Sequence, residues 1–352
     1  MPSHPNTTPR APRLLIARFS ALGDIVMMQP VVTALRATYG TDAVVDIVCL
    51  ARCREAAQLL SGIDVVHTVE RGTGEVLAAL RERQFDYLLD LHGTVRSRSL
   101  ARSLDVLTFS VDKQAWNRWS LIRGWRNTPV APFVDRCLNV LRPFNVSLPL
   151  PESWGVEAWG PLQTAQTGPI ADAPAAKLVV SLGSSHPGKH LSHAVLNAAL
   201  HTAHSKDAHV VLVGGNAERA RSEQLAAQHP HVTSAAGQWD LAQTAHAISM
   251  AQAVVTGDTV TMHLAAATGR PTAAVWGCTR PALGLAGWHA HPESIDVFPN
   301  VTCQQRPCSK HGATCKHTRS EDPFHPDRCS QKVDASEVSA WLGRILVSRR
   351  IR

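Results

Sequence analysis

The sequence has no long apolar run, and none approaches the roughly 18 uncharged residues that a membrane-spanning helix needs. It also lacks the apolar core of a signal peptide, because Arg18 and Asp24 interrupt the only candidate segment near the N-terminus. Residues 1–12 are polar and proline-rich, which predicts a disordered tail. We therefore expect a cytoplasmic protein whose contact with a membrane, if any, is peripheral.

Familiar nucleotide-binding and nucleic-acid-binding motifs are also missing. No helix-turn-helix, zinc-finger or RNA-binding pattern occurs, so we expect no nucleic-acid partner. The loop around Lys189 is not a P-loop, because His190 stands where that motif requires Ser or Thr. The strand-like "VLVGG" lacks the G-x-G-x-x-G of a dinucleotide site, which argues against a dehydrogenase.

The composition is that of a globular protein. The chain has 352 residues, of which 44% are hydrophobic and 18% charged, and this length is enough for two domains. The formal charge of +7 fits an anionic partner such as a nucleotide, a phosphorylated sugar or an acidic membrane surface.

Strand-like and helical segments alternate in both halves of the chain. "RLLIARFS" is typical of a buried strand and "PVVTALRATYG" of a helix, and the same alternation resumes at "KLVVSLG". Strands that alternate with helices of about ten residues predict βαβ units and parallel sheets. The predicted divisions are a tail (1–12), a Rossmann-like domain (13–150), a Pro- and Gly-rich linker (151–176), a second Rossmann-like domain (177–332) and a C-terminal helix (333–352).

The stretch "VVTGDTVTMHLAAATGRP" predicts a strand followed by a helix that Asp258 caps and Gly269 ends. A helix N-terminus at the carboxyl end of a parallel strand is a common phosphate site, since free N–H groups and the helix dipole face the ligand. Thr259 and Thr261 add hydroxyl donors. A capped helix without a ligand is the alternative.

Two other loops follow strands of the second half. "SLGSSHPGKHLS" offers glycines, Ser184, Ser185 and Lys189, a composition that can cradle phosphate. Glu218, in the first turn of the next helix, could accept hydrogen bonds from ribose hydroxyls. A solvated lysine and a glutamate that complements the helix dipole are the respective alternatives.

In the first half, "LHGTVRSRSLARS" follows a strand and carries Arg96 and Arg98. Such a basic loop could hold an anionic acceptor, although a charge run is often only a solvated face. The segment 116–126 interleaves three tryptophans with three arginines, which is the composition of a patch that contacts a membrane interface. Core tryptophans with flanking charges are the alternative.

The eight cysteines are unevenly distributed. Four are scattered and are interpreted as ordinary reduced thiols: Cys49, Cys53, Cys137 and Cys278. The other four fall within the Cys-rich segment 303–329: Cys303, Cys308, Cys315 and Cys329. In a cytosolic protein such a cluster favours metal over disulfides, although the spacing is not the C-x2-C of common zinc ribbons. We predict a structural zinc or iron site, with unligated thiols as the alternative.

Several of these motifs, in this order, resemble those of the glycosyltransferase family 9 heptosyltransferases: "LLIARFSALGDIVMMQPVVTALR", "FDYLLDLHG", "GSSHPGKH" and "GDTVTMHLAAATGRPTAAVWGCTRP". These enzymes transfer heptose from ADP-heptose during assembly of the lipopolysaccharide core. The resemblance implies the α/β GT-B fold, in which two Rossmann-like domains face a cleft and the C-terminal helix packs back on the N-terminal domain. It implies inverting transfer without a metal, at the cytoplasmic face of the inner membrane.

The resemblance also assigns roles to residues. Asp24 matches the family's general base and Lys189 a phosphate-binding lysine. The expected donor site comprises Ser184, Ser185, Lys189, Glu218, Trp239, Asp258, Thr259, Val260, Thr261 and His263. The expected acceptor site comprises Arg18, His92, Arg96 and Arg98.

One residue departs from the family pattern. Val260 stands where the family usually has Gly, and a β-branched residue is costly there only if φ is positive. Two alternatives stay open beside the heptosyltransferase interpretation. One is a transferase of this family that uses another nucleotide sugar or a protein acceptor, and the other is a non-catalytic nucleotide-sugar-binding protein.

Overall fold

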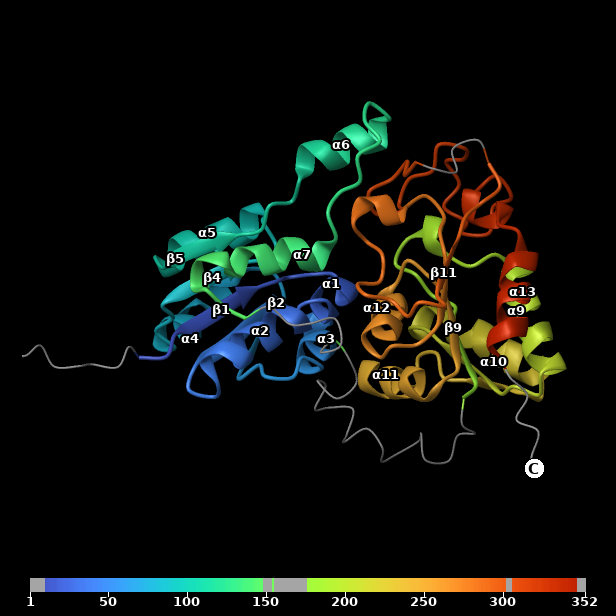
Figure 1. Ribbon diagram of the computed structural model, residues 1–352, viewed down its shortest axis with the longest axis horizontal. Coiled ribbons are helices and arrows are strands. Elements are labelled where there is room, and N and C mark those ends of the chain that lie inside the picture. Colours follow the sequence, from blue (N-terminus) through green and yellow to red (C-terminus); the bar gives the residue numbers. More distant parts are fainter. Residues whose placement is uncertain (1–9, 148–153, 155–175, 302–305, 347–352) are drawn as a thin grey trace, which may run out of the picture.

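The computed structural model describes residues 10–147, 154, 176–301 and 306–346, and contains two parallel β-sheets (Figure 1). The first has the strand order β3-β2-β1-β4-β5. Its strands are β1 (Arg13–Ala17), β2 (Val44–Leu50), β3 (Val66–Val69), β4 (Tyr87–Asp90) and β5 (Leu107–Ser110). All four pairings are parallel, which confirms the βαβ units predicted for the first half.

The second sheet has the order β11-β10-β9-β6-β7-β8 and is likewise parallel. Its strands are β6 (Leu178–Ser181), β7 (Val210–Val213), β8 (Val232–Ser234), β9 (Ala253–Gly257), β10 (Thr272–Val275) and β11 (Ile295–Val297). The expected α/β fold with two parallel sheets is therefore confirmed.

Helices connect the strands and cover the sheets. In the half of the chain that contains the first sheet lie α1 (Leu22–Val26), α2 (Gln29–Tyr39), α3 (Arg54–Gln58), α4 (Leu77–Glu82), α5 (Val95–Leu104), α6 (Ala115–Arg123) and α7 (Phe133–Leu138). With the second lie α9 (His193–Ser205), α10 (Arg219–Gln228), α11 (Leu241–Met250), α12 (Val260–Ala267) and α13 (Ala335–Ile345). Across the residues that the structure describes, no helix has the length and apolarity to span a membrane.

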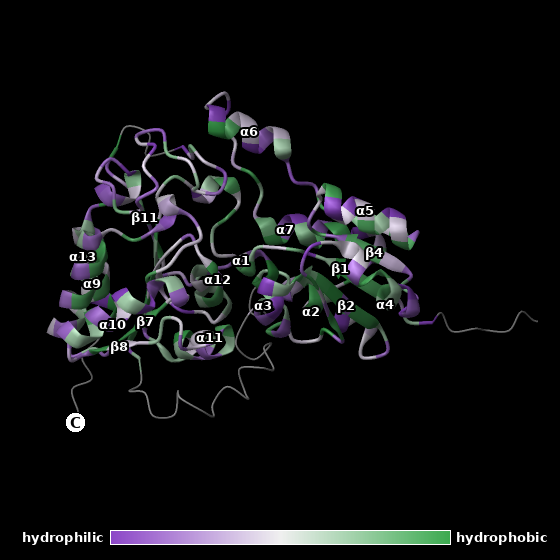
Figure 2. Ribbon diagram, turned by 180° about the vertical axis from the view of Figure 1, so that it is seen from behind, coloured by the Kyte–Doolittle hydropathy of each residue, from purple (hydrophilic) through white to green (hydrophobic). Residues whose placement is uncertain are grey.

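The strands form the core because both of their faces are covered. Every residue of β6, β7, β9 and β10 is buried, and Figure 2 shows hydrophobic colouring along the interior strands. Parallel strands that are buried on both faces need continuous apolar sequences rather than alternating ones. The runs "RLLIA", "LVVS" and "VVLV" meet this requirement.

The two sheets meet through short helices. α1 packs on α12, and α3 lies against α11 (Figure 1). The backbone N–H of Leu241 donates to a carboxylate oxygen of Glu55 at 3.3 Å across this contact. The segments that follow β1 and β9 are thereby held against each other.

The C-terminal helix corrects one expectation. α13 packs on α9, beside the second sheet, and not on the N-terminal part of the chain (Figure 1). Its buried residues Val338, Trp341 and Leu342 join the apolar core of the second sheet, and the Trp341 indole N–H donates to the Glu293 carbonyl at 2.7 Å. The apolar face of an amphipathic helix predicts burial but not the surface that buries it, and here that surface is α9. Asp334 caps this helix, since its carboxylate accepts the N–H of Ser336.

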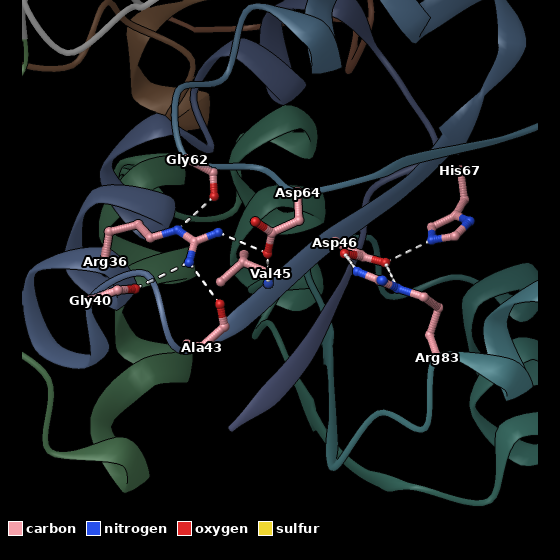
Figure 3. Close-up of polar contacts among 9 residues, drawn as sticks. All are labelled: Arg36, Gly40, Ala43, Val45, Asp46, Gly62, Asp64, His67 and Arg83. Carbon is pink, nitrogen blue, oxygen red and sulfur yellow. Dashed lines mark hydrogen bonds and ion pairs between the residues drawn. The ribbon is translucent and has the colours of Figure 1, made fainter. Parts of the chain in front are cut away.

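A buried carboxylate ties three elements of the first sheet together. Asp46 on β2 is fully buried and accepts hydrogen bonds from His67 at 2.8 Å and from two nitrogens of Arg83 at 2.8 and 2.7 Å (Figure 3). Nearby, Arg36 pairs with Asp64 at 2.9 Å in a more exposed setting (Figure 3). A buried charge is tolerated only when it is paired in this way.

Removing the Asp46 carboxylate is expected to destabilise the fold strongly. In Asp46→Ala the partly buried Arg83 and His67 lose their shared acceptor, and breaking such a pair costs about 3 kcal/mol of unfolding free energy. Urea denaturation measures this loss. The control Asp64→Ala, at the more exposed ion pair, is expected to cost about 1 kcal/mol. Equal losses in the two variants would contradict the prediction.

The contribution of Asp46 is also expected to depend on pH. Burial acts to raise the pKa of this carboxyl, but the bonds from His67 and Arg83 outweigh it and lower the pKa below its ordinary value. A group whose pKa falls on folding stabilises the protein above its unfolded pKa and loses that effect as pH falls through the folded pKa. The stability gap between wild type and Asp46→Ala should therefore be constant above about pH 5 and shrink below about pH 4.

Candidate active site between the two sheets

Asp24 lies on α1, immediately after β1, where α1 meets α12. Its side chain is 25% exposed, forms an ion pair with the Arg18 guanidinium and accepts the N–H of Ala21 at 3.1 Å. Arg18 is in turn fixed by a 2.6 Å hydrogen bond to the Leu91 carbonyl. The carboxylate is therefore held in one orientation while part of it faces solvent.

The charge state of Asp24 follows from these neighbours. Burial acts to raise the pKa of the carboxyl, but Arg18 and the Ala21 N–H together lower the pKa below its ordinary value. Asp24 is consequently ionised at neutral pH, as a general base must be before it accepts a proton.

Gly23 sets how closely the two halves approach. A Cβ on Gly23 would lie 2.6 Å from Cδ2 of His263 and 3.5 Å from the Val260 Cα. Only glycine lets α1 and α12 pack at this distance. His263 is itself buried, and burial lowers the pKa of its imidazole, so the ring is neutral at pH 7.

Gly23→Ala is expected to lower the activity of this site by about 100-fold, because displacement of reacting groups by about 1 Å has effects of this size. The fold of each sheet should persist, since the clash lies at the contact between them. The measurement is kcat/KM together with thermal unfolding. Gly74→Ala is a matched control, because a Cβ there meets nothing within 4 Å. Full activity of Gly23→Ala would show that the close contact is not required.

Opposite Asp24, Lys189 pairs with Asp258. The Lys189 Nζ lies 2.7 Å from Oδ2 of Asp258, and the two side chains are 15% and 6% exposed. Lys189 follows β6 and Asp258 follows β9, and these strands are neighbours in the sheet. Two loops that the sequence predicted separately as phosphate sites thus meet at one point.

The start of α12 differs from the expectation that Asp258 caps the helix. Thr259 is the N-cap residue, its hydroxyl hydrogen-bonds to Thr256 at 2.9 Å, and Asp258 instead faces Lys189. Val260 is the first helical residue and has no positive φ, so a β-branched side chain is tolerated there. The hydroxyl of Thr261 is buried and donates to Ser181 at 3.2 Å.

Glu218 and the loop after β6 lie against each other. Glu218 accepts the N–H of Gly215 at 2.9 Å, and a Cβ on Gly183 would come within 2.5 Å of its Oε2. In the same loop the Ser184 carbonyl contacts the imidazole of His190 at 3.0 Å, and Ser185 is exposed. Trp239, farther along the chain, is half-buried just before α11 and packs on the apolar core.

The expected acceptor residues gather near Phe19. The His92 ring lies edge-on to Phe19 at 5.5 Å, and the Arg96 guanidinium lies over the same ring at 5.6 Å. Burial, with the charges of Arg18 and Lys113, lowers the pKa of His92 to about 4, so this imidazole is neutral. Its Nδ1 is buried and has no hydrogen-bond partner among the described residues.

Arg98 lines a cavity of about 270 Å³ in the first half of the chain. The same cavity is lined by Asp90, Gly93 and Lys113, and Lys113 donates to the Gly93 carbonyl at 3.2 Å. Because Asp90, Arg98 and Lys113 are among the lining residues, charged groups are available to a ligand there.

Sequence reasoning missed a group of cations that the fold collects near Arg18. Lys113, Arg118 and Lys310 come from three distant segments, and burial lowers the pKa of each. The charges of Arg118 and Arg18 lower the pKa of both lysines further, which places these groups within electrostatic reach of one another. No local motif marks these residues, so no sequence signal could have assembled them.

The Cys-rich segment packs on the loop that carries Lys189. The N–H of Gly188 donates to the Gly312 carbonyl at 3.0 Å, and a Cβ on Gly312 would lie 2.8 Å from the Lys189 side chain. This packing places Lys310, two residues before Gly312, near enough to Arg118, Lys113 and Asp24 for their charges to affect its pKa.

The cysteines are arranged differently from the expectation. Cys278, interpreted from sequence as an isolated thiol, lies beside Cys308, whose N–H donates to the Cys278 carbonyl at 3.0 Å. Hydrogen bonding between the two thiols lowers the pKa of Cys308 to about 6 and raises that of Cys278. Cys303 lies outside the described residues. Within the described part of the chain, no group of three His, Cys, Asp or Glu side chains is placed to hold a metal, and the predicted zinc or iron site, which includes Cys303, stays a prediction.

Comparisons with known proteins agree with this architecture. A model of glycosyltransferase family 9 (heptosyltransferase) matches residues 74–317. Among solved structures, ADP-heptose lps heptosyltransferase II of E. coli is 18% identical with a TM-score of 0.64, covering 95% of this chain and 98% of that one. The E. coli heptosyltransferase WaaC with ADP is 20% identical with a TM-score of 0.62, covering 85% and 96%.

A third similar structure is the iron-containing dodecameric glycosyltransferase TibC of enterotoxigenic E. coli, which is 11% identical with a TM-score of 0.50, covering 95% and 76%. No curated protein sequence matches the chain. The family match covers more than half of the chain, and the structural matches show the same fold. The chain therefore belongs to glycosyltransferase family 9, the heptosyltransferase family, and has the GT-B fold.

Proposed function

We propose that the protein is an inverting glycosyltransferase that transfers heptose from ADP-heptose to a lipopolysaccharide core precursor, with Asp24 as the general base. The observation that carries this proposal is the position of Asp24: an ionised, partly exposed carboxylate held by Arg18 where α1 meets α12. The Lys189–Asp258 pair supports it, since it puts a cation where the two predicted phosphate loops converge.

The proposed reaction is a single displacement. A carboxylate oxygen of Asp24 takes the proton of the acceptor hydroxyl as that oxygen forms its bond to the anomeric carbon of heptose. The bond from this carbon to the β-phosphate oxygen breaks on the opposite face, and its electron pair leaves with ADP. Attack from the face opposite the leaving group inverts the anomeric centre.

Lys189 stabilises the leaving group in this proposal. Negative charge builds on the β-phosphate as the bond breaks, and a preorganised cation there lowers the barrier. The N-terminus of α12, which begins at Val260, supplies backbone N–H groups and the positive end of a helix dipole. The chain's own residues thus provide both the base and the stabilisation of ADP.

The donor and acceptor fall on opposite halves of the chain. We assign the nucleotide sugar to the domain 177–332, through Ser184, Ser185, Glu218, Trp239 and His263 in addition to the groups above. We assign the acceptor to the domain 13–150, through Arg18, His92, Arg96 and Arg98. The cations Lys113, Arg118 and Lys310 favour an acceptor that carries phosphate or carboxylate groups.

A thermal-shift panel of ADP-sugars and UDP-sugars tests the donor. A ligand that binds only the folded state stabilises it by about 2.7 kcal/mol at a concentration 100 times its Kd. We expect ADP-heptose to raise Tm most, ADP alone to raise it less, and UDP-sugars to leave it unchanged. Stabilisation by UDP-sugars only would overturn the donor assignment. Binding of ADP-heptose without transfer to any core acceptor would favour a non-catalytic binding protein. Transfer to a protein acceptor alone would show that the acceptor is not a lipopolysaccharide precursor.

A further inference from the structure

Helix α6 and the turn that follows it expose three tryptophans on one surface. Trp116, Trp119 and Trp125 are 58%, 38% and 66% exposed, although large aromatic side chains are normally buried. Their rings contact one another, with centroids 5.0 Å apart for Trp116 and Trp119 and 4.5 Å for Trp119 and Trp125. In both ribbon views α6 stands away from the first sheet (Figures 1 and 2).

The opposite side of α6 is already occupied. Leu121 is buried in a small apolar cluster with Val130 and Leu283, so α6 is packed against the second half of the chain. The N–H of Val130 donates to the Ala282 carbonyl at 2.8 Å and fixes this contact. The tryptophans therefore face outward because the packing surface of α6 is a different one.

The charge around the tryptophans has one sign. From Lys113 to Val134 the sequence contains no Asp or Glu, whereas Arg118, Arg123 and Arg126 follow Lys113. Arg123 and Arg126 are exposed, and the guanidinium of Arg123 lies 5.9 Å from the centroid of the Trp119 ring. Exposed tryptophan together with arginine is typical of protein surfaces that sit at the headgroup level of an anionic bilayer.

We infer that the tryptophan–arginine surface, formed by Trp116, Trp119, Trp125, Arg123 and Arg126, binds the surface of a bilayer that contains anionic phospholipid. The tryptophan rings enter the interface while the arginines pair with lipid phosphates. A second copy of this chain is a poorer occupant, because a two-fold contact through this surface would bring like-charged arginines together.

This surface belongs to the same helix as one of the cations near the candidate active site. Arg118 on α6 influences the titration of Lys113 and Lys310, so the lipid-facing helix and the cationic group share an element. An acceptor anchored in the bilayer would reach that group without leaving the membrane surface. The inference itself does not depend on the proposed reaction, since membrane binding is measured without substrate.

Co-sedimentation with vesicles tests the inference. The full-length protein is mixed with vesicles of phosphatidylglycerol and phosphatidylethanolamine, or of phosphatidylcholine alone, at several salt concentrations. We expect binding to the anionic vesicles that weakens with salt, and about ten-fold weaker partitioning for Trp116→Ser/Trp125→Ser. The matched control Leu107→Ser/Met250→Ser removes two equally exposed apolar side chains elsewhere and should bind like wild type.

A charge variant and a folding check complete the test. Arg123→Glu/Arg126→Glu should lower partitioning by at least about ten-fold, since each basic residue near an anionic surface contributes about 1 kcal/mol. Circular dichroism and Tm must match wild type in each variant. Unchanged binding by both double variants, or equal binding to phosphatidylcholine, would overturn the inference. A dimer in sedimentation velocity that Trp116→Ser/Trp125→Ser abolishes would instead assign the surface to self-association.

Discussion

Asp24→Asn is expected to lower kcat by about 1,000-fold while the affinity for the nucleotide sugar stays nearly unchanged. Asparagine keeps the size of the side chain and an oxygen that can accept from Arg18 and Ala21, but it cannot take a proton at neutral pH. The measurement is steady-state transfer combined with the rise in Tm on adding donor. An unchanged donor shift with lost turnover separates the missing base from a misfolded site.

A control variant and a pH profile test whether the Asp24 carboxylate itself accepts the proton. Asp42→Asn, at an exposed position away from α1, should retain full activity. Because the pKa of Asp24 is lowered, the carboxylate stays ionised as pH falls, and protonation of Asp24 should reduce wild-type kcat only below about pH 4. Full activity in Asp24→Asn would show that another group accepts the proton.

Lys189→Ala is expected to lower kcat/KM by several hundred-fold, with the larger part in kcat. Removal of one preorganised charge that faces a leaving group costs about 100- to 1,000-fold. The variant also leaves the Asp258 carboxylate unpaired next to the site of the diphosphate, which adds repulsion. Steady-state kinetics with ADP-heptose as the varied substrate separate the effect on turnover from the effect on binding.

A double variant distinguishes the two contributions. In Lys189→Ala/Asp258→Ala the repulsive carboxylate is gone, so part of the lost activity should return, whereas Lys189→Arg should keep most of the binding. Lys332→Ala removes an exposed lysine elsewhere and serves as the control. Wild-type kinetics in Lys189→Ala would place the diphosphate somewhere other than this pair.

The family and the architecture could be predicted from the sequence. Alternation of apolar runs with amphipathic segments predicts parallel sheets because a strand covered on both faces needs a continuous apolar stretch, as "LLIA" and "VVLV" show. Strand-to-helix transitions put Asp24, Lys189 and Asp258 at the carboxyl ends of strands, where α/β folds bind ligands.

The tertiary contacts of a helix or side chain were harder to predict than its place in the secondary structure. α13 was expected on the N-terminal domain and packs on α9, and Cys278 was expected alone and lies beside Cys308. The sequence shows the apolar face of α13 and the thiol of Cys278. The group that each of them contacts depends on the tertiary packing of distant segments. Local hydrophobic periodicity carries no information about which distant segments pack together.

The sequence by itself determined which segments become strands and helices, and thereby which side chains stand at strand ends. Only the tertiary structure decided that Lys189 pairs with Asp258, that Gly23 must lack a side chain against His263, and that Lys113, Arg118 and Lys310 share one electrostatic environment. The physical reason is range: backbone preference and apolar periodicity act over a few neighbouring residues, whereas ion pairs and close packing join groups that only the folded chain brings together.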